Sequence, residues 1–212
     1  MAKIIAISNQ KGGVGKTTTS VNLAACLGKM GKKTLLVDAD PQGNATSGVA
    51  IDKSKVKFST YSILVDGAKA EQCVLTTPYD NLHILPSSLD LAAAELEIAE
   101  KPHREALLKN ALLPIKQYYD YIIIDCPPSL GLITANALTV ADTFLVPIQC
   151  EYYALEGLSQ LMETIKLVQK HLNPKLDVEG VVLTMFDART NLSIQVVDEV
   201  KKYFKNKVYR TI

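Results

Sequence analysis

The chain has 212 residues, of which 48% are apolar and 21% are charged. This composition is typical of a globular protein and argues against disorder, and the length fits one domain with a core covered on two sides. Lys and Arg number 23 and Asp and Glu number 22, so the net charge is only +1. A chain this close to neutrality lacks the excess charge that attracts nucleic acid over long distances, and any anionic partner has to meet a local patch.

The cysteines and the N-terminus indicate a cellular compartment. Cys26, Cys73, Cys126 and Cys150 are widely spaced and form no metal-binding pair, which favours reduced and mostly buried thiols. The first apolar run is too short for a signal peptide, and no segment approaches the length needed to span a membrane. We therefore expect a cytoplasmic protein.

Short runs rich in Ile, Val and Leu alternate with segments of helical periodicity. We predict strands at 3–8, 33–38, 81–86, 119–125, 143–149, 179–186 and 207–212, and helices at 17–30, 88–99, 103–118, 131–140, 154–171 and 193–205. Continuous apolar strands between helices are typical of the α/β class, with a mainly parallel twisted sheet that helices cover on both faces. Segment 41–60 is weakly patterned, and we expect a mobile loop there.

A glycine-rich segment, NQKGGVGKTTTS at 9–20, joins the first predicted strand to the first predicted helix. Glycines let successive backbone N–H groups turn around phosphate oxygens, and the helix N-terminus adds the positive end of its dipole. Lys16 is placed to reach the β- and γ-phosphates, and the Thr17 hydroxyl can ligate Mg²⁺, although Gln10 stands where the usual consensus has its first glycine. The expected nucleotide-binding residues of this loop are Gly12, Gly13, Val14, Gly15, Lys16, Thr17 and Thr18.

The same loop contains a second lysine, Lys11. The form K-G-G-x-G-K-[ST]-T resembles the deviant Walker A loop of the ParA/MinD superfamily of ATPases, which have the P-loop NTPase type of sheet. The resemblance implies that Lys11 reaches the nucleotide of a partner subunit, so that ATP drives formation of a homodimer. A second cation can neutralise charge that develops on the γ-phosphate during transfer. A merely solvated lysine is the alternative.

Three aspartates follow predicted strands at the edge where open α/β sheets bind ligands: Asp38 and Asp40 in LLVDADPQGN, and Asp125 in YDYIIID. In the family that the chain resembles, Asp40 matches the switch I residue that positions the hydrolytic water, and Asp38 a Mg²⁺ or network residue. Asp125 has the Walker B form and would hold a Mg²⁺-bound water. Capping or turn aspartates are the alternative for Asp38 and Asp40.

Glu151 follows the predicted strand at 143–149. By position it resembles the family residue that meets the partner subunit's nucleotide or its Lys11. An acidic residue that interacts with the dipole of the following helix is the alternative.

The resemblance extends over almost the whole chain. PQGNATSG, DCPPSLGLIT, CEYYALEGLSQL, TMFDARTNLS and VKKYF resemble the Soj branch of the ParA family, the chromosome-segregation ATPases. It implies an ATP-bound dimer that binds DNA without sequence preference, and hydrolysis that a ParB/Spo0J-type partner stimulates. It also implies association with the nucleoid and no stable association with membranes.

The C-terminal part of the sequence is basic. From Arg189 to Ile212 there are six basic and two acidic residues, an excess of four positive charges. Arg189 matches the DNA-contacting arginine of the family, and Lys201 and Lys205 lie one turn apart on a predicted helix, so both can face one phosphate backbone. A solvated helix face is the alternative.

Two other members of the superfamily remain open as interpretations. A MinD-type membrane-cycling ATPase needs a C-terminal amphipathic helix that this sequence does not show. A metabolic synthetase or an iron–sulfur reductase shares the loop, but Cys126 has no suitably spaced companion for a cluster. Because the sequence stops at Ile212 inside a predicted strand, before the family's adenine-contacting segment, we expect a single ATPase domain over 1–212 that is truncated at its C-terminus.

Overall fold

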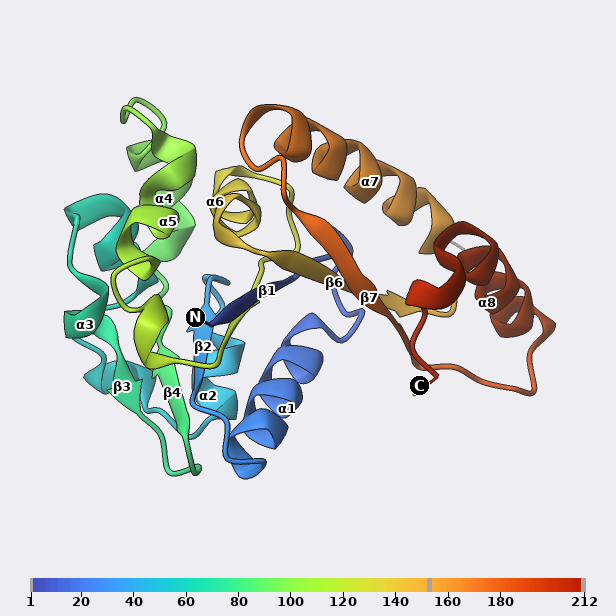
Figure 1. Cartoon of the computed structure of the whole chain (residues 1–212), viewed down its shortest axis with the longest axis horizontal. Helices are drawn as coiled ribbons and strands as arrows, with labels where there is room; N and C mark the ends of the chain where they lie inside the picture. The colour runs from blue at the N-terminus through green and yellow to red at the C-terminus, as the bar shows by residue number, and fades with distance from the viewer. Residues whose placement is uncertain (1, 152–153, 211–212) are drawn as a thin grey trace.

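The computed structural model describes residues 2–151 and 154–210. Within them, seven strands form one sheet in the order β3-β4-β2-β5-β1-β6-β7, and every neighbouring pair is parallel except β3 and β4 (Figure 1). The strands are β1 (Lys3–Ile7), β2 (Thr34–Asp38), β3 (Leu75–Thr76), β4 (Leu82–Leu85), β5 (Tyr121–Asp125), β6 (Thr143–Gln149) and β7 (Asp177–Thr184). The predicted mainly parallel sheet is confirmed.

Helices cover both faces of the sheet. They are α1 (Lys16–Lys29), α2 (Asn44–Gly48), α3 (Ala70–Cys73), α4 (Leu91–Glu97), α5 (Leu107–Leu112), α6 (Leu132–Val140), α7 (Ala154–His171) and α8 (Asn191–Phe204). Figure 1 shows α1 and α2 below the sheet and α4 to α7 above it. Helices on both faces are as predicted.

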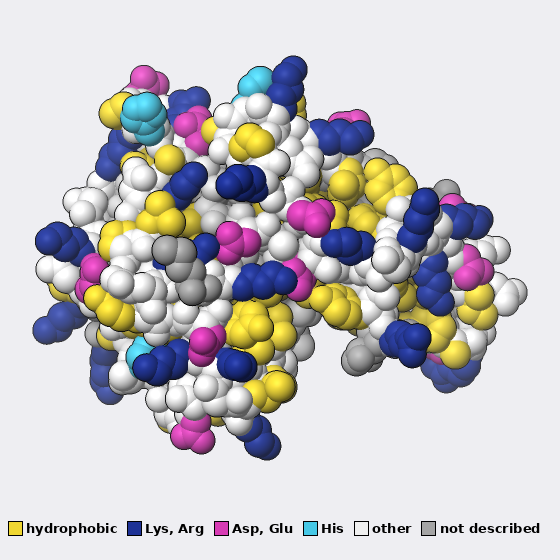
Figure 2. Space-filling view, in the orientation of Figure 1, with side chains coloured by type: hydrophobic (Ala, Val, Ile, Leu, Met, Phe, Trp, Pro, Cys, Tyr) yellow, Lys and Arg dark blue, Asp and Glu magenta, His cyan; other side chains and the backbone are white. Residues whose placement is uncertain are grey.

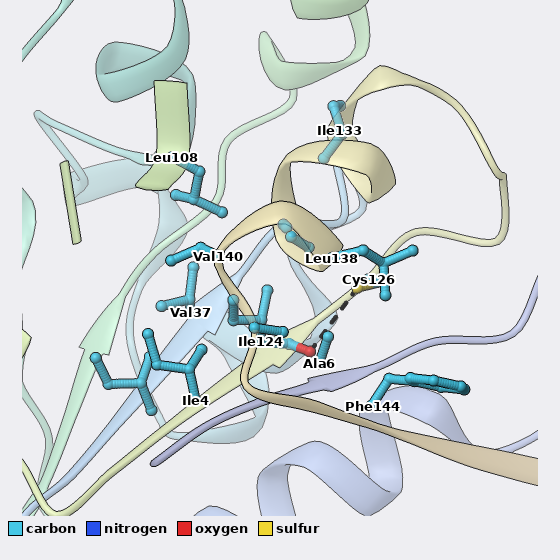
Figure 3. Close-up of a cluster of buried hydrophobic side chains, with 14 of the residues drawn as sticks. Ile4, Ala6, Val37, Leu108, Ile124, Cys126, Ile133, Leu138, Val140 and Phe144 are labelled. Atoms are coloured by element: carbon cyan, nitrogen blue, oxygen red, sulfur yellow. Dashed lines mark hydrogen bonds between the residues drawn. The ribbon is translucent and has the colours of Figure 1, made fainter. Parts of the chain in front are cut away.

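The apolar strands are explained by the two cores that they separate. In β5, Ile122 and Ile124 pack into the core under α4 to α8, whereas Ile123 packs with α1 and α2 on the other face. All three side chains are fully buried, and each such isoleucine stabilises the fold by about 1.5–3 kcal/mol. Figure 3 shows the first core, where Ile4 and Ile124 of adjacent strands meet side chains of α5 and α6. This double burial fixes the carboxyl ends of the central strands side by side.

Two predicted helices are shorter than their periodicity indicates. The segment predicted as a helix over 88–99 is helical only over α4, and the one predicted over 103–118 divides into α5 and two 3₁₀ turns. His103 has a positive φ of 53°, which a helix cannot contain, and Pro114 removes a backbone donor just after Leu113. Local backbone geometry therefore overrides the apolar spacing.

The loop predicted over 41–60 is wrong as a description of that segment. It contains α2 and a 3₁₀ turn, and Ala45, Thr46, Val49 and Thr60 are all fully buried. Helix α2 begins after Gly43, whose φ of 62° suits glycine, and packs Gly48 against Val21 of α1. Small residues make the pattern weak in sequence, but they allow close packing against α1.

The last predicted strand, 207–212, is largely wrong within the described residues. A 3₁₀ turn covers Lys205–Lys207, and Val208 makes a single parallel bridge to Val181 of β7. Residues 211 and 212 lie outside the described residues. Of the four cysteines, Cys73, Cys126 and Cys150 are buried, as predicted, and Cys26 is exposed.

Candidate nucleotide site

The phosphate loop lies between β1 and α1, as the sequence predicts. Gly13 and Gly15 have φ of 75° and 89°, which side chains with a Cβ rarely adopt, so both glycines are needed for the turn. The loop is also held by β7, the strand at the edge of the sheet. The Thr184 hydroxyl at the end of β7 donates to the Val14 carbonyl oxygen at 2.9 Å, and Val14 itself is buried. The loop is therefore anchored at its centre before any ligand binds.

A side chain at the end of β1 fixes the start of the loop. The amide of Asn9 donates to the Pro147 carbonyl oxygen at 2.8 Å, and its Oδ1 accepts the backbone N–H of Lys11 at 3.0 Å. Asn9 is buried and links the loop to β6. Neighbouring strands on one side of β1 thus position the loop through Asn9 and Thr184.

Lys16 lies across the loop. Its Nζ donates to the Lys11 carbonyl oxygen at 2.8 Å, and its side chain is largely buried. Burial lowers the pKa of Lys16, and the nearby carboxylate of Asp125 opposes that shift. Lys16 is the first residue of α1, where the backbone N–H groups have no acceptor within the helix. A buried ammonium beside such N–H groups favours the binding of an anion.

Asp38 and Asp125 lie opposite one another in the paired strands β2 and β5. Both are fully buried, and this burial raises the pKa of Asp125 to about 7 and the pKa of Asp38 to about 6. The charge of Asp38 raises the pKa of Asp125 further, whereas the hydroxyl groups of Thr17 and Ser20 act in the opposite direction. Two buried carboxyl groups at one strand edge favour a bound cation, because a cation stabilises their ionised forms.

The hydrogen bonds of these two aspartates differ. Oδ2 of Asp38 accepts from the backbone N–H and hydroxyl of Thr46 at 2.7 and 2.6 Å, and Oδ1 accepts from the N–H of Asp40 at 3.2 Å. Asp125 Oδ1 accepts from the Ser20 hydroxyl at 2.8 Å, but its buried Oδ2 accepts no hydrogen bond within 3.5 Å among the described residues, although the Thr17 hydroxyl is near enough to lower the pKa of the group. Asp38 therefore fits the network alternative, and Asp125 retains an oxygen for a ligand.

A pocket of about 330 Å³ brings Asp40 together with most of the phosphate loop, whereas Lys11, Val14, Asp38, Asp125 and Glu151 do not line it. Asp40 lies in the wall that faces the loop and is largely buried, with its Oδ1 accepting the N–H of Gln42 at 2.9 Å. The pocket is lined by Gly12, Gly13, Gly15, Lys16, Thr17, Thr18, Asp40, Gln42, Asn44, Pro128 and Met185. A larger pocket, of about 470 Å³, lies between α3 and α5 and is lined by none of the predicted site residues.

The residues around this pocket fit Mg²⁺ held jointly with a nucleotide. The donors offered are the Thr17 hydroxyl, which lines the pocket, and a buried carboxylate oxygen of Asp125, which lies near Thr17. Hard oxygen ligands of this kind suit Mg²⁺. No group of three or more His, Cys, Asp or Glu side chains in the described part of the chain could hold a metal alone. Phosphate oxygens and water would therefore have to complete the coordination, as is usual for Mg²⁺ in sites that bind nucleoside triphosphates.

Glu151 pairs with Lys11 of its own chain. The two side chains form an ion pair and are each about one-third exposed. Glu151 directly follows the β6 end, and Tyr152 and Tyr153, between it and α7, lie outside the described residues. The sequence analysis expected Glu151 to meet the nucleotide of a partner subunit or its Lys11, and in the single chain Glu151 pairs with Lys11 of the same subunit.

Sequence reasoning missed several residues of this site, among them Ser20, Thr46, Thr184 and Met185. Ser20 lies one turn after Lys16 on α1, a spacing that could have indicated its contact with Asp125. Thr46, Thr184 and Met185 had no such signal, because their contacts with the site depend on chain segments brought from elsewhere. Met185 follows β7 at the ligand-binding edge of the sheet and has a positive φ of 53°. For a residue with a long side chain this conformation is uncommon and occurs at functional sites.

The candidate DNA-contacting residues lie outside the pocket, in the segment that follows β7 and along α8. Arg189 is exposed and makes an ion pair with Asp187, with Nη2 and Oδ2 2.7 Å apart. Lys201 is exposed on α8, but Lys205 lies beyond the helix, because the chain leaves helical geometry there with φ 49° and ψ −116°. The prediction that Lys201 and Lys205 share one helix face is therefore wrong. Figure 2 shows Lys and Arg side chains gathered over this part of the molecule, at the right of the view.

Comparisons with known proteins identify the family. A family model described as an AAA domain matches residues 2–178. The chain is 63% identical over all of its 212 residues to the sporulation initiation inhibitor protein Soj of Bacillus subtilis, and covers 84% of that protein. It is 53% identical over the same length to the chromosome partitioning protein ParA of Myxococcus xanthus, of which it covers 75%.

A solved structure agrees with this relationship. The cobyrinic acid a,c-diamide synthase of Mycobacterium smegmatis, with bound ADP and magnesium, superposes with a TM-score of 0.91 at 39% identity, over 97% of this chain and 83% of that one. None of the helices in the described residues has the length and apolar character required to cross a membrane. With its P-loop fold and its match to Soj and ParA over the full length, the chain belongs to the Soj/ParA family of chromosome-partitioning ATPases.

Proposed function

We propose that the protein is an ATP-dependent DNA-segregation ATPase that acts in chromosome or plasmid partitioning. The observation that carries this proposal is one pocket in which the phosphate loop, Lys16 and Asp40 meet. Asp125 is buried next to this pocket, close enough to Lys16 and Thr17 for their charges and hydroxyl to affect one another's pKa. The 63% identity to Soj over the full chain supports the same assignment. A fold alone supports many functions, so the proposal depends on the pocket and the close relatives together.

The nucleotide chemistry follows from the residues of the pocket. The loop N–H groups and Lys16 would hold the phosphates of ATP, and Thr17 and Asp125 would hold Mg²⁺, directly and through water. Bound Mg²⁺ would neutralise charge on the β- and γ-phosphates. Asp40, on the facing wall, would orient the hydrolytic water, because its carboxylate borders the same space as the loop. The products would be ADP and phosphate.

Dimerisation would follow from the position of Lys11. In the single chain its ammonium pairs with the carboxylate of Glu151. The triphosphate of a partner subunit would offer several negative charges to the same ammonium. We propose that ATP binding in two chains therefore moves Lys11 from Glu151 to the partner's nucleotide. Lys11 would then be a catalytic residue for the neighbouring site.

DNA binding would use the basic C-terminal part of the protein. Arg189, Lys201 and Lys205 are candidates, and dimerisation would double the number of positive charges that face one DNA. Binding would be independent of sequence, because contacts with phosphates carry no base information. Hydrolysis, stimulated by a ParB-type partner, would release the DNA. This cycle places the protein in the cytoplasm on the nucleoid.

Light scattering and DNA retention test the proposal in one experiment. The whole chain is given Mg²⁺ with either ATP or ADP, and its mass and its retention on DNA are measured at about 50 mM and about 300 mM salt. We expect a dimer mass and salt-sensitive retention with ATP alone. Equal mass and equal retention in the two nucleotides would contradict the proposal.

The similarity to a synthase structure supports a second candidate, an ATP-dependent synthetase. Such an enzyme would hydrolyse ATP only when a small carboxylic acid and an amine donor are present. ATP turnover without added acid, stimulated by DNA and by a ParB-type protein, would support the partitioning function. Turnover that depends on the acid would support the synthetase.

A further inference from the structure

Helix α4 has two apolar faces, and only one of them is covered. Leu91, Ala94 and Ile98 point into the core and are fully buried. On the opposite side, Leu96 is 82% exposed and Leu89 is 74% exposed, and these are the two most exposed large hydrophobic side chains among those that the structure describes. Single exposed leucines are common, but a pair on one face of one helix marks a surface for contact.

The exposed residues form a continuous surface. Asp90 has helical dihedral angles (φ −60°, ψ −24°), so Leu89 and Leu96 lie two turns apart on the same side of the helix. Ala92 and Ala93, between them, are also exposed. We call Leu89, Ala92, Ala93 and Leu96 the α4 stripe. Small alanines between two leucines leave room for a partner's large side chains.

The α4 stripe has a negatively charged border. Asp90, Glu97 and Glu100 are exposed along it. The two nearest basic side chains are engaged elsewhere, because Lys101 donates to the carbonyl oxygens of Leu64 and Val65, and Arg104 donates to the Ala99 carbonyl oxygen and pairs with Glu105. An apolar stripe with an acidic border complements a helix that is apolar on one face and basic beside it. It repels an acidic partner and a membrane with anionic lipids.

Both ends of α4 are connected to the loops that carry the site carboxylates. Before the helix, the N–H of Ser87 donates to the Thr46 hydroxyl at 3.0 Å, and Thr46 in turn binds Asp38. Within the helix, Glu95 turns inward and its Oε1 accepts the N–H of Ile133, in the first turn of α6, at 3.2 Å.

The contact of Glu95 with the start of α6 depends on a glycine. A Cβ at Gly131 would lie 2.2 Å from Oε1 of Glu95, so only glycine lets the carboxylate approach this closely. Gly131 ends the loop that begins after Asp125. A partner on α4 would therefore contact a segment that is hydrogen-bonded both to Thr46, the partner of Asp38, and to the start of α6, which follows the loop after Asp125.

We infer that the α4 stripe and its acidic border are a docking surface for a basic amphipathic helix of a partner protein. The inference goes beyond the proposed function, because the surface is formed by described residues of one segment and requires neither nucleotide nor DNA. A failure of the partitioning proposal leaves this surface unaffected, and a failure of docking leaves the nucleotide site unaffected.

The test uses a synthetic amphipathic helical peptide of about 18 residues, made of leucine and lysine, and a control peptide in which glutamate replaces every lysine. Binding to the whole chain is measured by fluorescence anisotropy without nucleotide. We expect the lysine peptide to bind at least tenfold more tightly than the glutamate peptide. Equal affinity of the two peptides would overturn the inference, because it would mean that the border has no part in recognition.

Variants locate the binding. The double variant Leu89→Ser, Leu96→Ser should weaken binding of the lysine peptide at least tenfold, and the double variant Glu97→Lys, Glu100→Lys should weaken it similarly by charge. The matched control is Met30→Ser with Leu167→Ser, two side chains that are 73% and 61% exposed elsewhere, which should change the affinity less than twofold. Equal losses in the control and in the stripe variant would overturn the inference.

Thermal unfolding shows whether the variants are folded. We expect midpoints close to wild type because the replaced side chains are exposed, with a small decrease for the Glu97 variant, whose carboxylate accepts from the Tyr61 hydroxyl. Two other occupants are distinguished by the same variants. If the whole chain without nucleotide forms dimers that the stripe variant abolishes, a second copy covers the stripe and the inference is wrong. If the stripe binds phosphatidylcholine vesicles more tightly than the peptide, the partner is a membrane and the inference is also wrong.

Discussion

The two candidate functional regions of this protein are built in opposite ways. Around the phosphate loop, Lys16, Asp38 and Asp125 are buried and held by other strands and helices. At the C-terminal end, Arg189 and Lys201 are exposed, and the ion pair of Arg189 is with Asp187, two residues away. Buried groups act as a unit, whereas exposed charges act nearly independently.

This difference determines how each region responds to a mutation. Removal of one group from the nucleotide pocket leaves its neighbours misplaced or unpaired, so the loss of nucleotide affinity or of hydrolysis rate is large. Removal of one exposed charge subtracts one contact with phosphate and leaves the rest of the surface intact. Four substitutions test the comparison, and we describe them from the largest expected effect to the smallest.

Asp40→Ala should lower the rate of ATP hydrolysis by about 10²- to 10⁴-fold, because it removes the group proposed to orient water. ATP binding should persist, so the variant should accumulate as an ATP-bound dimer. Phosphate release and light scattering measure the two effects. Asp66→Ala, at an exposed carboxylate, is the control. Hydrolysis by Asp40→Ala at the wild-type rate would show that its assigned role is wrong.

Lys16→Ala should weaken nucleotide binding by roughly 10- to 100-fold, since a charge-assisted hydrogen bond contributes about 1.5–3 kcal/mol. Calorimetric titration with a non-hydrolysable ATP analogue measures the affinity. Lys29→Ala removes an exposed lysine from the last turn of the same helix and should leave the affinity unchanged. Similar affinities in the two variants would mean that Lys16 does not contact the phosphates.

Arg189→Glu should weaken DNA binding by about tenfold. It should also reduce the slope of log affinity against log salt concentration by about one, the value for one lost phosphate contact. The ATP-dependent dimer mass should remain, because Arg189 lies outside the nucleotide pocket. DNA retention at several salt concentrations measures the effect, with Lys175→Glu as the control. An equal loss in both variants would indicate a diffuse charge effect in place of a specific contact.

Asp125→Asn should change how stability depends on pH in the nucleotide-free protein. The pKa of Asp125 is raised in the folded state to about 7, so the proton is held more tightly there than in the unfolded chain. The contribution of this group to the free energy of unfolding is therefore fully present below about pH 4 and is lost as the pH rises through about 7. Asparagine has no such loss, so its unfolding temperature should rise relative to wild type by on the order of 5 °C between pH 5 and pH 8.

Thermal unfolding with a chelator present measures this last effect, and Asp198→Asn, at an exposed carboxylate on α8, is the control. A difference between Asp125→Asn and wild type that does not vary with pH would show that burial does not raise the pKa of this carboxyl group.

The central strands and the phosphate loop could be predicted because their causes are local. β5 is apolar at every interior position since it is buried on both faces, and the loop glycines are set by the turn itself. Segment 41–60 could not be predicted in this way. Its helix α2 is built from small residues, and it depends on packing against α1. The position of Lys205 outside α8 could not be predicted either, because helical periodicity does not show at which residue the backbone leaves the helix.

The sequence by itself determined the alternation of strands and helices, the phosphate-binding loop, and the aspartates at the ends of two strands. Those features depend on periodicity and on residue type, which are both local properties. Only the tertiary structure decided which carboxylate oxygens accept hydrogen bonds. Thr46 donates to Asp38, and Ser20 donates to Asp125, because separate segments of the chain pack together. The tertiary structure also decided that Lys11 meets Glu151 within one subunit and that, among the described residues, Leu89 and Leu96 remain exposed beside α4. Contacts between residues far apart in the chain depend on the whole fold.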